Sequence, residues 1–276
     1  IPVEEIVPGK AYHYATTCGA CPSACGLLAK NRDGRPIKLE GNPEHPLSRG
    51  GLCAVGQASI LGLYDSKRLK GPAMGGAASN WKKVDAAILA ELDAIRKSGG
   101  SVRVLSGTIN GPANVAAIKN FLKTFKDARH VVYDALSSSA IADAHEKTHG
   151  LRVTPHYKMC CAEVIVGIGA DFLGSWLSPV EFTAGYSALR LSEGKAPKMT
   201  YHAQIESLMT LTGAKADRRV LAGPEELVAV TGQLAARLAT LAGGPVRASS
   251  AISSSAPDAA IDEIAKRLWE ARGKAL

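Results

Sequence analysis

The chain has 276 residues, 46% of them hydrophobic, and carries a formal net charge of +8 at pH 7. This apolar content excludes a globally disordered chain, and the length allows one large domain or two ordinary ones. No stretch of 18 apolar residues occurs, so we expect no membrane-spanning helix. The Lys and Arg residues are scattered without a run of five, which argues against a nucleic-acid partner and favours a protein partner with an acidic face.

Residues 1–72 are rich in turn-forming residues and predict a small β-rich domain. Short strand patterns cover Tyr12–Thr16, Gly26–Lys30 and Pro36–Glu40. The Asp33-Gly34 pair between the last two strands is typical of a β-hairpin turn. A domain of this size buries little apolar surface, so we expect a bound metal group to stabilise it.

Four cysteines in this first domain have the spacing C-x2-C-x3-C-x27-C. They are Cys18, Cys21, Cys25 and Cys53. Three thiolates crowd into one short segment and the fourth stands alone, an asymmetry that suits the separate irons of a cubane 4Fe-4S cluster. A zinc site is the alternative, although zinc-binding domains favour paired C-x2-C knuckles. The spacing therefore predicts a 4Fe-4S cluster and a role in electron transfer.

Residues 73–276 predict a doubly wound, mainly parallel α/β domain, entered through a linker over Gly71–Asn80. Strand and helix patterns alternate here, as they do when helices connect parallel strands. Strands are expected at Val102–Leu105, His130–Tyr133 and Glu163–Ile168, and a further short strand is expected to end at Val220–Leu221. Helices are expected after a cap at Ser79, from Pro112 through Phe125, and over Ser139–His149, Pro179–Leu191, Pro224–Ala242 and Asp258–Arg272.

Two loops after predicted strands are weak candidates for cofactor binding. One begins at Gly107, and the other contains Gly167, Gly169 and Asp171. Both would lie at the carboxyl edge of the sheet, where doubly wound folds bind nucleotides. The second loop lacks the last glycine of G-x-G-x-x-G, because Phe172 occupies that place. A tight strand-to-helix turn without a ligand explains either loop equally well.

Other reactive side chains give weaker patterns. His145 and His149 lie four residues apart on one predicted helix, which suits a solvated face better than a metal site. The serine run at 137–139 is more typical of a helix cap than of a metal ligand. Cys160 and Cys161 are adjacent and poorly placed for a mutual disulfide. No P-loop, G-x-S-x-G motif or Cys-His pair supports another catalytic chemistry.

Thr16–Leu69 resembles the iron-sulfur domain that opens the large subunit of molybdopterin oxidoreductases, the complex iron-sulfur molybdoenzymes. The resemblance rests on the four cysteines and on a motif of the form G-x-P-x-K-x-E-G-N-P-x-H-P. Its matching residues here are Ile37, Lys38, Glu40, Gly41, Asn42, Pro43 and His45. The resemblance implies that the four cysteines bind a 4Fe-4S cluster.

Downstream segments are similar to one branch of that family. Gly169–Phe182 resembles polysulfide-reductase-like enzymes and the iron-sulfur B subunit of alternative complex III, a quinol-oxidising respiratory complex. Glu4–Thr17 is similar to the same subunit, and Ser207–Ala235 resembles the end of the family's first cofactor-type domain. The resemblance thus extends over nearly the whole chain.

Three departures from the family pattern argue against a working molybdopterin site. Val55 stands where the resemblance implies Lys or Arg, two residues after the fourth cysteine, and its side chain cannot hydrogen-bond a pterin. The region Asp134–Ala140, where a metal ligand would come, has serines but no cysteine. The chain is also several hundred residues shorter than a pterin dinucleotide enzyme requires, so it is either one piece of a split subunit or part of a longer chain.

These observations predict an iron-sulfur electron-transfer subunit of a membrane-associated respiratory quinone or cytochrome oxidoreductase, without a catalytic site of its own. The resemblance implies three partners: a ferredoxin-like subunit with several clusters, a quinone-binding membrane subunit and a c-type cytochrome. It also implies export by the twin-arginine route and a peripheral position on the periplasmic side. The alternatives are the N-terminal half of a split catalytic molybdopterin oxidoreductase and a structural module with zinc or no metal.

Overall fold

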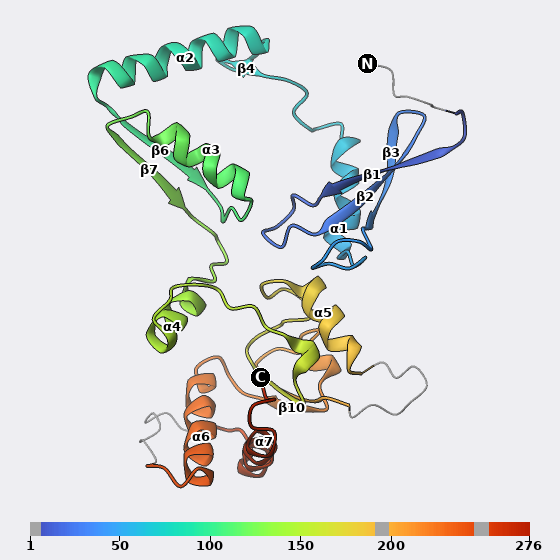
Figure 1. The fold of residues 1–276 in the computed structure, drawn as a ribbon, viewed down its shortest axis with the longest axis vertical. Helices are drawn as coiled ribbons and strands as arrows, with labels where there is room; N and C mark the ends of the chain where they lie inside the picture. The colour runs from blue at the N-terminus through green and yellow to red at the C-terminus, as the bar shows by residue number, and fades with distance from the viewer. Residues whose placement is uncertain (1–6, 191–198, 246–253) are drawn as a thin grey trace. The chain divides into compact units, whose positions relative to one another are not determined.

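The computed structural model describes residues 7–190, 199–245 and 254–276, and these form two compact units that interleave along the sequence (Figure 1). Unit 1 draws on Ile1–Ala24, Ala29–Leu39 and Ala54–Thr154. Unit 2 draws on Cys25–Leu28, Glu40–Cys53 and Pro155–Leu276. The sequence predicted two consecutive domains that meet at residue 72, whereas these two units alternate along the chain. The domain boundary at residue 72 stays a prediction.

A three-stranded sheet begins the chain, as predicted. Its strands are β1 (Ala11–Thr17), β2 (Gly26–Arg32) and β3 (Arg35–Gly41), in the order β1-β2-β3. Asp33 and Gly34 join β2 to β3 with φ angles of 50° and 76°, so both lie in the left-handed region that such a hairpin turn requires. Two short helices follow, α1 (Ala54–Ala58) and η1 (Ser59–Leu63).

The segment predicted as a plain linker contains a small hairpin. Strands β4 (Ala73–Met74) and β5 (Ala77–Ala78) pair antiparallel. Gly75 and Gly76 form the turn with φ angles of 55° and 79°, which residues with a side chain rarely adopt. The glycines that made the segment resemble a linker therefore serve a defined turn.

Unit 1 continues with two parallel strands and three helices. They are α2 (Trp81–Ser98), β6 (Ser101–Ser106), α3 (Pro112–Leu122), β7 (Asp127–Val132) and α4 (Ser139–His149). The cap prediction at Ser79 was wrong by one residue, because Asn80 Oδ1 accepts the Lys83 N–H at 3.0 Å. The α3 prediction ran too far, since the helix ends at Leu122 and Phe125 is buried beyond it.

Unit 2 is built on three parallel strands in the order β10-β9-β8. They are β8 (Val164–Ile168), β9 (Tyr201–Glu206) and β10 (Arg218–Leu221). The sequence analysis predicted no strand at β9. The helices are α5 (Pro179–Ala188), α6 (Glu226–Leu241) and α7 (Asp258–Glu270), each shorter than predicted, with short turns at η2 (Met159–Cys161) and η3 (Gly213–Lys215). The predicted end of α5 at Leu191 lies outside the described residues.

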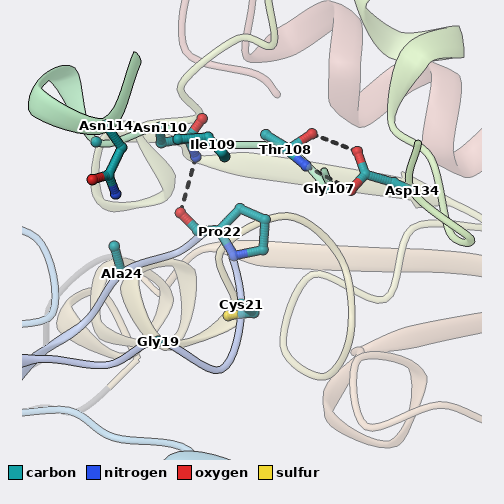
Figure 2. A pocket seen from close by; sticks show the side chains of 11 residues that line it. Gly19, Cys21, Pro22, Ala24, Gly107, Thr108, Ile109, Asn110, Asn114 and Asp134 are labelled. Carbon is teal, nitrogen blue, oxygen red and sulfur yellow. Dashed lines mark hydrogen bonds between the residues drawn. The ribbon is translucent and has the colours of Figure 1, made fainter. Parts of the chain in front are cut away.

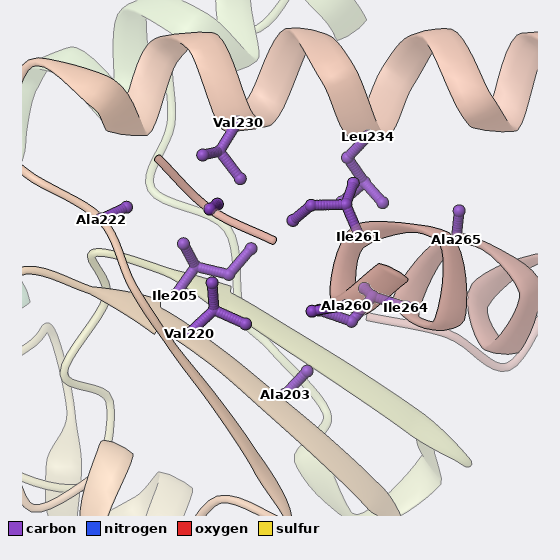
Figure 3. Close-up of a cluster of buried hydrophobic side chains, with 11 residues drawn as sticks. Ala203, Ile205, Val220, Ala222, Val230, Leu234, Ala260, Ile261, Ile264 and Ala265 are labelled. Atoms are coloured by element: carbon purple, nitrogen blue, oxygen red, sulfur yellow. The ribbon is translucent and has the colours of Figure 1, made fainter. Parts of the chain in front are cut away.

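Apolar side chains cover one face of β9 and pack against α6 and α7 (Figure 3). Ala203 and Ile205 point into this cluster, where Val230 of α6 and Ile261 of α7 are fully buried. The prediction of a mainly parallel α/β fold is confirmed, since every described strand pair from β6 onward is parallel.

The opposite face of β9 is polar but also buried. His202 and Gln204 are completely inaccessible, and Phe172 and Tyr186 of the α5 side place their rings 5.2 and 5.4 Å from the His202 ring. Tyr186 Oη lies 3.1 Å from His202 Nδ1. Helices thus cover both faces of the sheet, which is the doubly wound arrangement.

Chain segment 274–276 extends this sheet beyond β8. The Leu276 N–H donates to Val164 O, and the Val166 N–H donates to Leu276 O, both at 2.9 Å. The bridge between Val164 and Ala275 is parallel. These last residues therefore continue the sheet in the same sense as β8 and β9.

The buried position of His202 predicts acid sensitivity of the fold. Burial lowers the pKa of His202 to about 4 from its usual 6.5, so the unfolded chain binds this proton at a higher pH than the folded chain does. Between pH 6.5 and 4 the free energy of unfolding should fall by about 1.4 kcal/mol per pH unit, to a total of about 3 kcal/mol. Urea unfolding at several pH values measures this loss. His202→Gln should flatten the dependence, whereas His149→Gln, at an exposed site, should not; equal slopes in the two variants would contradict the assignment.

Candidate metal centre

The four predicted ligands lie where regular structure begins or ends. Cys18 directly follows β1, Cys25 directly precedes β2, and Cys53 directly precedes α1. Cys21 lies in the turn between the first two, where its carbonyl accepts the Ala24 N–H at 3.3 Å. Loop positions anchored by strands and helices are common for metal ligands.

None of the four cysteines is in a disulfide bond, and their exposure differs. Cys18 and Cys25 are buried, whereas Cys21 and Cys53 are exposed. Cys18 and Cys21 belong to unit 1, and Cys25 and Cys53 belong to unit 2. Across the part of the chain that the structure describes, no group of three or more Cys, His, Asp or Glu side chains is placed to hold a metal ion. The ligand set therefore stays a prediction from the spacing.

Within unit 2, the loop that leads to Cys53 is fastened to the start of β2. The Asn42 N–H donates to Gly26 O, and the Gly50 N–H donates to Asn42 O, both at 2.9 Å. The Gly26 N–H donates to Ser48 Oγ at 3.2 Å, and Ser48 Oγ lies 3.0 Å from His45 Nδ1. These bonds fix the backbone next to Cys25 from outside its own strand.

Three glycines in and beside this loop lie so close to neighbouring atoms that there is no space for a side chain. A Cβ on Gly41 would lie 2.2 Å from Gly50 O, and one on Gly26 would lie 2.5 Å from the His45 ring. A Cβ on Gly51 would lie 2.7 Å from Cγ1 of Val180, the second residue of α5. The residues beside Cys25 and Cys53 are therefore held by contacts that only glycine permits.

The chemistry of the donor set fits a 4Fe-4S cluster. Such a cluster takes four Cys thiolates, and four unoxidised cysteines with family-like spacing are present. The four cysteines thus supply the number and the type of ligand that such a cluster takes.

A pocket in unit 1 adjoins Cys21 (Figure 2). Its volume is about 310 Å³, and it lies beyond the carboxyl ends of β6 and β7. Its walls include Cys21 and Pro22 on one side and Gly107, Asn110 and Asp134 on the other. The carboxyl edge of parallel strands is the usual ligand position in such folds.

Hydrogen bonds shape the walls of this pocket. Asn110 Nδ2 donates to Pro22 O at 2.9 Å (Figure 2). The Thr108 N–H donates to Asp134 Oδ1 at 2.8 Å, and the Thr108 hydroxyl bonds the other carboxylate oxygen. These two bonds hold the pKa of Asp134 below its usual value. Gly107, one of the weak candidates from the sequence, lines this pocket, and Asn110 lies in the same loop but was not itself predicted.

The second candidate loop is closed by its own hydrogen bonds. The Gly169 N–H donates to Ile205 O, and the Gly174 and Ser175 N–H groups donate to Asp171. Burial acts to raise the pKa of Asp171, but the hydrogen bonds from Thr212 and Ser175 lower it overall. The N–H groups of Gly169, Gly174 and Ser175 are thus engaged within the protein.

The weaker sequence patterns have local explanations. His145 and His149 stack with ring centroids 4.4 Å apart, and their helix ends at Gly150 as predicted. Ser137 Oγ accepts the Ser139 N–H at 3.1 Å, which makes the serine run a turn at the start of α4.

Comparison with known proteins defines the class of this chain. Residues 13–65, which contain the four cysteines, match the family model described as the molybdopterin oxidoreductase Fe4S4 domain. The menaquinone reductase molybdopterin-binding-like subunit of Nitratidesulfovibrio vulgaris is 34% identical over 113 residues, which cover 39% of this chain and 16% of that protein. The chain thus contains an iron-sulfur domain of molybdopterin oxidoreductase type.

Longer but weaker similarity extends over most of the chain. Nitrate reductase of Klebsiella oxytoca is 26% identical over 217 residues, which cover 76% of this chain and 24% of that protein. Acetylene hydratase from Pelobacter acetylenicus shares the fold with a TM-score of 0.57 at 15% identity, over 83% of this chain and 32% of that one. The chain is thus similar to the N-terminal region of molybdopterin oxidoreductases, and it spans about a third or less of the length of these relatives.

The packing at Gly41 predicts a strong effect of a single methyl group. Gly41→Ala should displace the loop that leads to Cys53, lower the iron bound per chain after anaerobic reconstitution, and reduce the free energy of unfolding by about 1–3 kcal/mol. Gly62→Ala is the matched control, because a Cβ there meets no atom within 4 Å. Iron analysis and urea unfolding measure both effects, and equal results for the two variants would contradict the close packing.

Proposed function

We propose that this chain is the iron-sulfur electron-transfer part of a membrane-associated respiratory oxidoreductase. Cys18, Cys21, Cys25 and Cys53 would bind one 4Fe-4S cluster. The observation that carries the proposal is the match of residues 13–65, which contain all four cysteines, to a molybdopterin oxidoreductase Fe4S4 domain. When bound, such a cluster supplies one-electron oxidation and reduction.

The chain's own residues would position the cluster and set its surroundings. The bonds from Ser48 and Asn42 hold the backbone beside Cys25, and Gly51 lets the segment before Cys53 lie against α5. The burial of Cys18 and Cys25 keeps water from two of the four sulfur positions.

Two features favour electron transfer over a catalytic site on this chain. Val55 is 66% exposed and offers no hydrogen bond where the family resemblance implies a cationic side chain. The Asp134–Ala140 segment contains serines but no cysteine, and its Ser137 hydroxyl is engaged with the backbone of Ser139.

The partners follow from the resemblance to the alternative complex III B subunit and from a relative named as part of a menaquinone reductase. We propose a ferredoxin-like multi-cluster subunit, a quinone-binding membrane subunit and a c-type cytochrome as partners, and no nucleic acid. Among the described residues no helix is long and apolar enough to span a membrane. We propose a peripheral position on the periplasmic side, reached by twin-arginine export.

The cluster assignment predicts a specific loss in one cysteine variant. After anaerobic reconstitution, the wild-type chain should bind about four irons and four sulfides and give a low-temperature EPR signal on dithionite reduction. Cys53→Ser should lose most of this iron and the signal, whereas Cys160→Ser should keep both. Stoichiometric zinc in a chain purified without reconstitution, together with EPR silence, would overturn the proposal in favour of the structural module.

A catalytic molybdopterin subunit is the second candidate, and the pocket beside Cys21 favours it. That pocket lies at the carboxyl edge of β6 and β7, and its 310 Å³ is at the lower end of the range for small-molecule sites. Asn110, Asn114 and Asp134 are the polar groups available to a pterin there.

A metal inventory of the assembled complex separates the two candidates. For the electron-transfer subunit we expect iron without molybdenum or tungsten on this chain. Molybdenum or tungsten near one per complex, with a pterin released on denaturation and lost in Asp134→Ala, would instead establish the catalytic candidate.

A further inference from the structure

Two cysteines outside the proposed cluster set present their thiols side by side. Cys160 and Cys161 lie in the short turn η2, and their Sγ atoms are 3.7 Å apart. Both residues are exposed, and both thiols are free. Successive side chains on an extended strand point to opposite faces, so this common orientation is a product of the turn.

The turn η2 is anchored by packing against α5. Met159, its first residue, is 3% exposed and belongs to a buried cluster with Phe182 and Tyr186 of α5. Gly185 of α5 lies against it, since a Cβ there would be 3.3 Å from Met159 Cβ and 3.4 Å from the Cys160 N atom. Backbone bonds from Cys161 to Lys158 and from Ala162 to Met159 complete the turn. The two exposed thiols are therefore attached to a turn whose first residue, Met159, is buried.

The geometry suits a shared third atom better than a direct sulfur–sulfur bond. Consecutive Cα atoms are about 3.8 Å apart across a trans peptide, whereas disulfides usually need about 4.4–6.8 Å. A single atom can bond to both sulfurs only if they lie less than two bond lengths apart, or about 4.6 Å for bonds of about 2.3 Å. The observed separation of 3.7 Å meets this condition.

A ligand that binds Cys160 and Cys161 must need no more than two sulfur atoms from this chain. Zinc and iron-sulfur clusters take four protein ligands in structural sites, and the described part of the chain offers no third Cys, His, Asp or Glu near enough to complete a metal site. Trivalent arsenic compounds with one organic group need only two thiols, which replace their two exchangeable oxygen ligands.

We propose that Cys160 and Cys161 form a two-thiol binding site for trivalent arsenicals, separate from the cluster ligands. In the binding step two S–H and two As–O bonds break, two As–S bonds form, and the two protons leave with the oxygens as water. Arsenic stays trivalent, so the step needs no oxidant or reductant.

Phenylarsine oxide tests the site on the cluster-loaded protein. After incubation and tryptic digestion, mass spectrometry should find one phenylarsenic group per chain on the peptide 159–190, whose only cysteines are Cys160 and Cys161. The peptides 11–30 and 50–67, which carry the proposed cluster ligands, should remain unlabelled. This result is independent of the cluster's function, because iron content and EPR signal are measured on the same sample.

Single variants provide the decisive comparison. Cys160→Ser and Cys161→Ser should each weaken phenylarsine oxide binding by about a hundredfold or more, because the second As–S bond forms within one molecule at a high effective concentration. Both variants should retain the iron content and the urea-unfolding midpoint of the wild type. Binding that persists in either variant, or labelling confined to peptides 11–30 and 50–67, would overturn the proposal.

Discussion

Burial of β9 on both faces is the constraint from which the rest of unit 2 is organised. One face packs Ala203 and Ile205 against α6 and α7, and the other packs His202 against the rings of Phe172 and Tyr186. The second contact fixes α5, whose Val180 lies against Gly51. The segment that leads to Cys53 is thus positioned, through one helix, by the central strand.

The charged side chains around this core form ion pairs at the ends of its strands. Asp217 accepts the His202 N–H and pairs with Arg190 at 2.6 Å, and Glu206 at the end of β9 pairs with Arg219 at 2.7 Å. Hydrogen bonding to Arg190 is the largest of the effects that lower the pKa of Asp217. Glu206 is buried, and its pairing and hydrogen bonds offset the cost of burying its charge, so a polar strand can occupy the centre of the sheet.

The sequence was most informative where local chemistry decides structure. Asp33-Gly34 predicted a hairpin, Pro112 and Pro179 marked helix starts, and the cysteine spacing identified the family through residues that the Fe4S4 match also covers. The strand β9 was missed because His202, Gln204 and Glu206 look solvent-exposed in the sequence. Their polar groups are bonded in the fold by residues distant in sequence, among them Tyr186, Ala170 and Arg219. The loop after β6 was predicted as a weak cofactor-binding candidate, but the Cys21 side of its pocket was missed, since Asn110 and Pro22 meet only in the folded chain.

The contact between Gly51 and Val180 has a consequence for how this kind of domain can evolve. A Cβ at position 51 would lie 2.7 Å from the Val180 Cγ1 atom, so neither position can grow while the other stays unchanged. Among homologues that keep this packing, a larger residue at 51 should occur together with a smaller one at 180. Positions 51 and 180 should therefore covary, although more than a hundred residues of chain separate them.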